Sequence, residues 1–161
     1  MTERIATEEL TAWRTFLTAH AAVVARIERE LAEAREIPLT WYDVLIELYE
    51  APGQRLRLHE LADAVVLSRS RVTRLVDRLE QAGMLIRQAD PTDGRGAFAV
   101  LTPTGHDALR RSWPIYARGI REHFSRHLGD AEAAALTAGL GRVVEALRPA
   151  DPGTAAPNGS K

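Results

Sequence analysis

The hydrophobic period of the chain changes from helical to extended near its middle, and this change constrains the fold more than any other feature. Leu58–Val65 carries a short helical pattern, and three residues separate it from a second helical pattern over Arg69–Ala82. Gly83 follows at the position where a helix C-terminus favours a left-handed residue. Met84–Ala89 and Ala97–Leu101 then read as two short strands. This order predicts a helix-turn-helix followed by a β-hairpin.

The second of these helices has one apolar face and one polar face. The apolar face is formed by Val72, Leu75, Val76 and Leu79. The polar side carries Ser70, Arg71, Thr73, Arg74, Asp77, Arg78 and Gln81, and Ser68 precedes it as the expected N-cap. Arginine pairs bidentately with guanine, and hydroxyls and backbone N–H groups near a helix N-terminus bind phosphate. We therefore expect this side to enter the major groove of DNA, although the pattern alone also permits an ordinary solvated helix face.

The polar loop 90–96 joins the two predicted strands and carries Arg95 between two glycines. A cation on such a loop, beside a recognition helix, suits the narrow minor groove, where the negative potential is strongest. The loop is thus predicted to be a DNA-binding wing, with a solvated hairpin as the alternative. Its glycines do not indicate a nucleotide-binding loop, because neither a helix nor a Lys-Ser/Thr pair follows them directly.

Basic residues are concentrated in the same part of the chain, although the 161-residue protein has a net charge of only −1. Between residues 55 and 78 the basic residues are Arg55, Arg57, Arg69, Arg71, Arg74 and Arg78, against the acids Glu60, Asp63 and Asp77. A local excess of this kind is the electrostatic footprint of a nucleic-acid-binding face.

Composition and missing motifs exclude several other classes of protein. Hydrophobic residues make up 45% of the chain and charged residues 27%, the balance of a globular protein with a core. The sequence has no cysteine, no apolar run near the roughly 20 residues of a membrane span, and no signal-peptide pattern. It also lacks a nucleophile elbow, a P-loop, an HExxH helix and a dinucleotide fingerprint. We expect a cytoplasmic protein that is not an enzyme, needs no cofactor and has no membrane partner.

A heptad-like seam runs through the first predicted helix, which Thr7 is expected to cap. The residues of this seam are spaced three and four apart over about 25 residues, and His20 interrupts them. They are Leu10, Trp13, Leu17, Val24, Ile27, Leu31 and Ala34. A helix with such a narrow stripe packs against partner helices. These can come from a second subunit or from the same chain, so a homodimer and an intramolecular bundle both remain open.

Two further helices are predicted near the C-terminus. Thr102-Pro103 opens the first, which continues to about Leu128 and should bend at Pro114. Its inner side is marked by Leu109, Trp113, Tyr116, Ile120 and Phe124. Asp130 is expected to cap the last helix, whose inward residues are Leu136, Leu140, Val143, Val144 and Leu147. The tail after this helix has the composition of a disordered segment.

The run LSRSRVTRLVDRLEQAGMLIR over 67–87, followed by Asp93-Gly94-Arg95 and by VLTPTG over 100–105, strongly resembles the MarR family of bacterial transcription regulators. The resemblance covers residues 7–148 in outline. It implies a mainly α fold, a winged helix-turn-helix with a small β-hairpin wing and long N- and C-terminal dimerisation helices. The implied parts are dimerisation helices at 7–36 and 103–148, a DNA-binding lobe at 37–102 and a disordered tail at 149–161. The implied function is that of a homodimer that binds a palindromic double-stranded DNA operator and represses transcription until a small molecule binds.

The resemblance and the polar face together assign DNA contacts to nine residues. They are Ser68, Arg69, Ser70, Arg71, Thr73, Arg74 and Arg78 of the recognition helix and Asp93 and Arg95 of the wing. Asp77 lies on the same side and would repel phosphate unless it is paired. We expect Asp77 to meet Arg95 or an arginine of its own helix and thereby to orient the wing.

The resemblance also implies an effector site between the dimerisation helices and the DNA-binding lobe. The candidates for its lining are Trp13, His20, Trp41, Tyr42, Trp113 and Tyr116, any of which could equally be a core residue. We expect an apolar or aromatic effector, for example a phenol, with His20 or Arg14 supplying polarity.

Two alternatives remain open from the sequence. His123 and His127 are spaced i, i+4 in a predicted helix, the geometry of a zinc clip, although no third ligand is evident. Zinc-sensing members of the family that this chain resembles carry their ligands where Ser112 and Tyr116 stand here, so the resemblance does not extend to a metal site. The other alternative is a winged helix used only for protein contact, against which the arginines of both the recognition helix and the wing argue.

Overall fold

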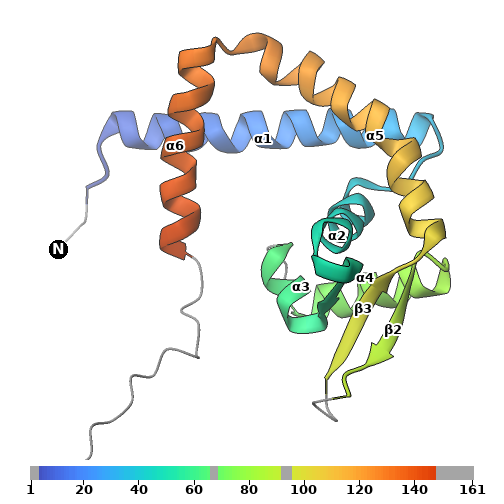
Figure 1. Cartoon of the computed structure of the whole chain (residues 1–161). Helices are drawn as coiled ribbons and strands as arrows, with labels where there is room; N and C mark the ends of the chain where they lie inside the picture. Colours follow the sequence, from blue (N-terminus) through green and yellow to red (C-terminus); the bar gives the residue numbers. More distant parts are fainter. Residues whose placement is uncertain (1–3, 66–68, 92–95, 148–161) are drawn as a thin grey trace, which may run out of the picture. The chain divides into compact units, whose positions relative to one another are not determined.

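The computed structural model describes residues 4–65, 69–91 and 96–147, and only the backbone of Arg69. Within these ranges the fold is mainly α-helical with one small antiparallel sheet, as the sequence predicted (Figure 1). The chain divides into two structural units, one ending at Phe124 and the other beginning at Ser125. Over the described ranges, no helix combines the length and the hydropathy that a membrane span requires.

The described part of the first unit contains five α-helices and three strands. Its helices are α1 (Thr7–Glu33), α2 (Leu39–Glu50), α3 (Leu58–Ala64), α4 (Arg69–Gln81) and α5 (Pro103–His123), with a 3-10 turn at Pro52–Gln54. Its strands are β1 (Arg55–Arg57), β2 (Leu85–Ala89) and β3 (Ala97–Leu101). The second unit contains a 3-10 turn at Ser125–His127 and the helix α6 (Asp130–Leu147).

The three strands form one antiparallel sheet in the order β1–β3–β2. β2 and β3 are the predicted hairpin, with Leu85 opposite Leu101. β1 was not predicted, because a three-residue segment with arginine at both ends has no strand pattern of its own. Pairing with β3, which sets Leu56 opposite Ala99, makes this segment a strand. Tertiary contact therefore supplies what the local sequence does not.

The helix-turn-helix and the sheet share one buried core. Its most deeply buried side chains include Val44, Leu45 and Leu48 of α2, Leu61 of α3, Val72, Val76 and Leu79 of α4, and Leu85 of β2. Leu75 of α4 packs against this core and is partly buried. The apolar face predicted for α4 is thereby confirmed.

α1 packs against α5 through its C-terminal half. Ile27 is buried there, and it lies so close to α5 that a Cβ added at Gly119 would be 2.7 Å from Ile27 Cγ1. Trp13 and Leu17, earlier in the same seam, are 56% and 43% exposed. The first half of the seam is therefore uncovered in the described chain.

The predicted cap of α1 was wrong by one residue. Thr7 is already helical, and Ala6 occupies the cap position. The Ala6 N–H donates to the Glu9 carboxylate at 3.1 Å, so the first turn is capped by an acid within it and not by a hydroxyl.

α5 begins as predicted. The Thr102 hydroxyl accepts a hydrogen bond from the Gly105 N–H at 3.2 Å, and Pro103 is the first helical residue. Gly105 lies against the turn between α4 and β2, because a Cβ added there would be 2.2 Å from the Met84 carbonyl oxygen. Pro114 lies inside the helix, which changes direction along its length in Figure 1.

The predicted end and inner side of α5 both require correction. The helix ends at His123 and not near Leu128, because Phe124 leaves the helical region at φ −132° and ψ −71°. Trp113 and Phe124, predicted to point inward, are exposed by 53% and 42%. Leu109 is buried and Tyr116 and Ile120 pack against the core, as predicted, while small residues such as Ala108 and Ser112 complete the inner side.

In the second unit, α6 carries an apolar face that is largely exposed. Leu140, Val143, Val144 and Leu147, which were predicted to point inward, are all exposed. Asp130 is part of the first turn and is not the cap, because the Gly129 N–H donates to the Glu132 carboxylate at 2.8 Å. The predicted disordered tail at 149–161 lies outside the described residues.

Candidate functional site

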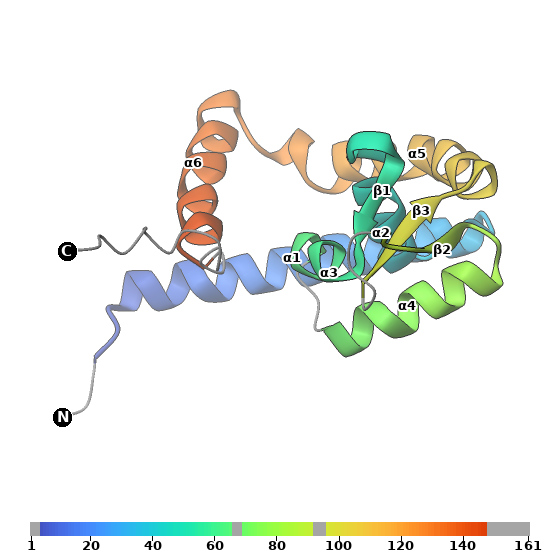
Figure 2. The same ribbon diagram turned by 60° about the horizontal axis from the view of Figure 1, so that its bottom comes forward.

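α4 is anchored by its apolar face, so that its arginine-bearing side points away from the core. Val76 and Leu79 are fully buried. At the C-terminus Gly83 has φ +69°, and the N–H groups of Gly83 and Met84 donate to the carbonyls of Glu80 and Leu79. These bonds close the helix in a Schellman turn, as the position of Gly83 predicted. In Figure 2, α4 lies at the margin of the first unit, with one side turned away from the other elements.

The residues predicted to contact DNA on α4 lie on this outer side. Ser70, Arg71, Thr73, Arg74 and Arg78 are all exposed. The three arginines are spaced three and four residues apart, so they share one side of the helix and make it positive. Ser68, Asp93, Arg95 and the Arg69 side chain lie outside the described part of the structure.

Asp77, half-buried on α4, pairs with an arginine of the wing strand β2. Arg87 donates from Nη2 to Asp77 Oδ1 at 2.5 Å and from Nη1 to Glu80 Oε2, and its backbone N–H donates to Glu80 Oε1 at 2.9 Å. Desolvation opposes the charge of Arg87, but these hydrogen bonds outweigh it and raise the Arg87 pKa. The sequence predicted Arg95 or an arginine of α4 as the partner of Asp77. The partner in the structure is Arg87 of β2, which the sequence did not indicate. We call this set of three residues the Arg87 clamp.

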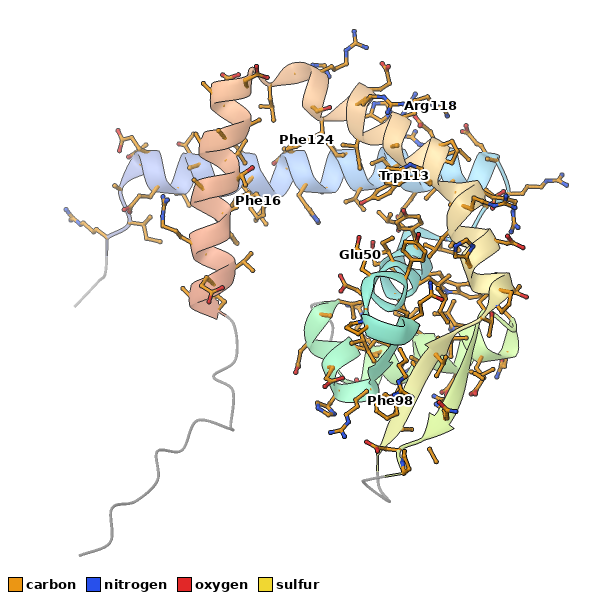
Figure 3. The ribbon with its side chains drawn as sticks, viewed as in Figure 1. Phe16, Glu50, Phe98, Trp113, Arg118 and Phe124 are labelled. Carbon is orange, nitrogen blue, oxygen red and sulfur yellow. The ribbon has the colours of Figure 1, made fainter. Side chains whose placement is uncertain are left out.

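A second ion pair fixes the base of the hairpin to β1. Arg57 Nη2 lies 2.8 Å from Asp90 Oδ2, and the Asp90 side chain is only 1% exposed. Arg55 and Arg57 also lie over the ring of Phe98, at 4.8 and 5.6 Å from its centroid (Figure 3). A buried carboxylate needs its partner, so this pair holds the hairpin where the wing loop begins. No motif in the sequence pointed to it, because β1 itself was not predicted.

A cavity of about 660 Å³ lies between α2 and α5. It is lined by Tyr42, Asp43, Ile46, Tyr49 and Glu50 from α2 and by His106, Leu109, Arg110, Trp113 and Tyr116 from α5. Figure 3 labels one residue of each wall, Glu50 and Trp113. The volume falls in the range of pockets that bind small organic ligands.

Half of the residues predicted to line an effector pocket line this cavity, namely Tyr42, Trp113 and Tyr116. Trp13 and His20 are not part of its lining, because they lie on the exposed first half of α1. There Phe16 stands between their rings, at centroid distances of 6.0 and 6.2 Å. Trp41 is not part of the lining either, because it packs against the core.

The acidic residues of the cavity wall were not predicted, because no motif marks them. Desolvation by burial, together with the charges of Glu47 and Glu28, raises the pKa of Asp43 to about 6. Burial and the charges of its acidic neighbours, Glu50 and Asp43 among them, raise the pKa of Tyr42 to about 12. The α2 wall of the cavity is therefore acidic and resists the addition of further negative charge, whereas the α5 wall carries the basic residues His106 and Arg110.

The histidine pair does not form the clip that its spacing suggested. α5 ends at His123, while His127 belongs to the separate turn Ser125–His127. His123 Nε2 lies 2.7 Å from Glu30 Oε1 of α1, and this hydrogen bond lowers the Glu30 pKa against the effect of burial. In the described residues, no group of three or more His, Cys, Asp or Glu side chains is arranged to hold a metal ion.

A helix-turn-helix with an outward basic helix, followed by a β-hairpin, defines the winged-helix class of DNA-binding regulators. A sequence model described as the MarR family matches residues 36–96. The chain is 34% identical over 113 residues to the uncharacterized HTH-type transcriptional regulator YkoM of Bacillus subtilis (strain 168), covering 70% of this chain and 71% of that protein. It is 38% identical over 104 residues to the HTH-type transcriptional regulator MhqR of the same organism, covering 65% and 70%.

Among solved structures, the chain is similar to Sco3205, a MarR family transcriptional regulator from Streptomyces coelicolor in complex with DNA. The TM-score is 0.85 at 32% identity, and the match covers 93% of this chain and 94% of that one. The chain belongs to the MarR family. It is a transcriptional regulator and not an enzyme, as the sequence predicted.

Proposed function

We propose that the chain acts as a homodimer that binds a palindromic double-stranded DNA operator and represses transcription there until a small aromatic molecule fills the cavity between α2 and α5. The observation that carries this proposal is the exposed arginine side of α4, whose orientation is fixed by the buried face opposite. The solved complex of Sco3205 with DNA supports the same use of the fold in this chain.

The nine predicted DNA contacts divide between two grooves. In the major groove, the arginines of α4 read guanine edges or bind phosphate, and Ser68, Ser70 and Thr73 add phosphate contacts. Arg95, with Asp93 in the same loop, serves the minor groove. Asp77 takes no part in binding but orients the wing through the Arg87 clamp.

The exposed apolar side chains of α1 and α6 support a homodimer. On α1 these are Trp13, Phe16 and Leu17, and on α6 they include Val143 and Val144. On each helix these side chains are neighbours in sequence, and large exposed apolar patches mark sites of protein–protein contact. A two-fold dimer presents two copies of α4 to half-sites about one helical turn apart, which requires an operator that is itself palindromic.

The place of the cavity supports control by a ligand. α2 packs in the same core as α4, while α5 follows directly from β3 and packs against α1 at Gly119. A ligand between α2 and α5 favours a conformer with a different angle between these two helices, provided that it binds that conformer more tightly. The spacing of the two recognition helices then no longer fits the operator, and transcription resumes.

The proposal is tested by fluorescence anisotropy with DNA from upstream of the gene and a scrambled duplex. We expect wild type to prefer the upstream DNA by about 10³-fold or more. Arg74→Ala should lose about 10- to 100-fold in affinity, since one good arginine–base pair contributes about 1–3 kcal/mol. The matched control is Arg29→Ala, which removes an exposed arginine of α1 and should change affinity little. Equal, weak binding of both duplexes by all three proteins would contradict the proposal.

A further inference from the structure

We propose that the cavity between α2 and α5 selects an aromatic organic cation, such as a protonated aryl-alkyl amine, over neutral, phenolic or carboxylate ligands of the same shape. The inference rests on the proposed function only in treating this cavity as the effector site. It keeps the expected aromatic ring of the effector but replaces the neutral or phenolic ligand expected from the sequence with one that carries a positive charge.

The rings of the cavity wall provide surfaces for both parts of such a ligand. Tyr42 of α2 and Tyr116 of α5 lie with ring centroids 4.8 Å apart, and Trp113 meets Tyr116 at 6.2 Å in an edge-on contact. Further along, Tyr49 lies 5.4 Å from the ring of His106. Aromatic faces bind apolar rings by area burial and attract ammonium groups through their quadrupole.

The carboxylates of the wall select the sign of the charge. Asp43 and Glu50 both line the cavity, and neither makes an ion pair within the described residues. The lining also holds two basic residues of α5: Arg110, which forms an exposed ion pair with Asp107 at 3.3 Å, and His106, whose ring lies against that of Tyr49. An anionic ligand would meet the two carboxylates on the α2 wall, whereas a cation would pair with them, and the desolvation of Asp43 makes its attraction for a cation stronger than in water.

The groups around Asp43 make the affinity of the cavity for a cation depend on pH. The acidic and phenolic groups that act on Asp43 or are affected by it are Glu47 and Tyr42 on its own helix, Glu28 on α1 and Tyr116 on α5, while the basic residues of the same cavity, His106 and Arg110, lie on the α5 wall. Burial and the charges of Glu47 and Glu28 raise the pKa of Asp43 to about 6. A bound cation favours the ionised form, so cation affinity should rise as the pH increases through 6, and binding near that pH should release protons.

The test uses the full chain without DNA and three probes that share a phenylethyl or benzyl group. 2-Phenylethylamine is cationic at pH 7.5, 2-phenylethanol is neutral and phenylacetate is anionic. By isothermal titration calorimetry we expect the amine to bind at least about tenfold more tightly than the alcohol, with phenylacetate weakest. The preference for the amine should decline between pH 7.5 and pH 5, while alcohol binding stays constant.

The variant Asp43→Asn/Glu50→Gln should bring amine affinity down to that of the alcohol and leave alcohol binding intact. Retained alcohol binding also shows that this variant is folded. The matched control, Glu33→Gln, changes an exposed acid of α1 outside the cavity lining and should behave as wild type. Equal affinity for the three probes, tighter binding of the alcohol or phenylacetate, or no binding of the amine would overturn the inference. Because the test contains no DNA, these outcomes would not contradict the proposed operator binding. Conversely, a failure of operator binding would not contradict a measured preference for the amine.

Discussion

The carboxylates beside the wing and those beside the cavity have opposite surroundings. Asp77, Glu80 and Asp90 each meet an arginine, and these arginines come from the strands β2 and β1. Asp43 and Glu50 on α2 have no such partner in the described chain, and burial together with the charges of Glu47 and Glu28 raises the pKa of Asp43. Carboxylates beside the wing thus fix the position of the strands, whereas those on α2 present negative charge to the cavity.

Removal of a paired carboxylate should have the largest effect on stability. Asp90→Asn should lower the free energy of unfolding by about 2–3 kcal/mol, since it leaves the charge of Arg57 without its buried partner. Urea denaturation measures this loss. The control is Asp107→Asn, which breaks the exposed pair with Arg110 and should cost at most about 0.5 kcal/mol. Losses of equal size in both variants would show that burial of the pair is unimportant.

The Arg87 clamp should affect DNA binding more than stability. Arg87→Met leaves the carboxylates of Asp77 and Glu80 unpaired on the helix proposed to bind DNA, and we expect about a tenfold loss of operator affinity. Adding Asp77→Asn to this variant should recover part of the loss, because one repulsive charge is removed. Anisotropy titrations at several salt concentrations measure both effects. Unchanged affinity and salt dependence in Arg87→Met and in Asp77→Ala would rule out an orienting role for Asp77.

The smallest effect on stability is expected for Asp43 in the cavity wall. Here the substitution should stabilise the protein, whereas Asp90→Asn destabilises it. The pKa of Asp43 is higher in the folded state than in the unfolded chain, so the folded state binds more protons. This carboxylate therefore lowers stability as the pH rises from about 4 through 6. Asp43→Asn should raise Tm at pH 7.5, and the gain should vanish toward pH 4. A fall in Tm at pH 7.5, or a gain that does not depend on pH, would contradict the unpaired state of Asp43.

Local signals predicted the recognition helix and the hairpin well. The period of three and four from Val72 to Leu79 and the glycine at position 83 are both readable without tertiary contacts, and the structure confirms both. The end of α5 carried no such signal, because neither glycine nor proline lies between Gly119, which is inside the helix, and Gly129, while the helix already ends at His123. β1 exists only through its pairing with β3, so a local pattern could not reveal it.

The candidate site also has one part that the sequence predicted and one part that it did not. The arginine side of α4 follows from the spacing along one helix, and for that reason the sequence sufficed to find it. The cavity joins α2 to α5, whose walls are about sixty residues apart in the chain, and neither Asp43 nor Glu50 belongs to a motif. Arg87 was likewise missed because its partners lie on a different element.

The central claim is that two copies of the chain read a palindromic DNA sequence. Selection of bound fragments from a library of genomic DNA, followed by sequencing, tests it most directly, because it requires no assumption about where the operator lies. We expect enrichment of an inverted repeat whose half-sites are about one helical turn apart, and loss of this enrichment with Arg74→Ala. Fragments without a common motif, or a single half-site without its inverted copy, would contradict it.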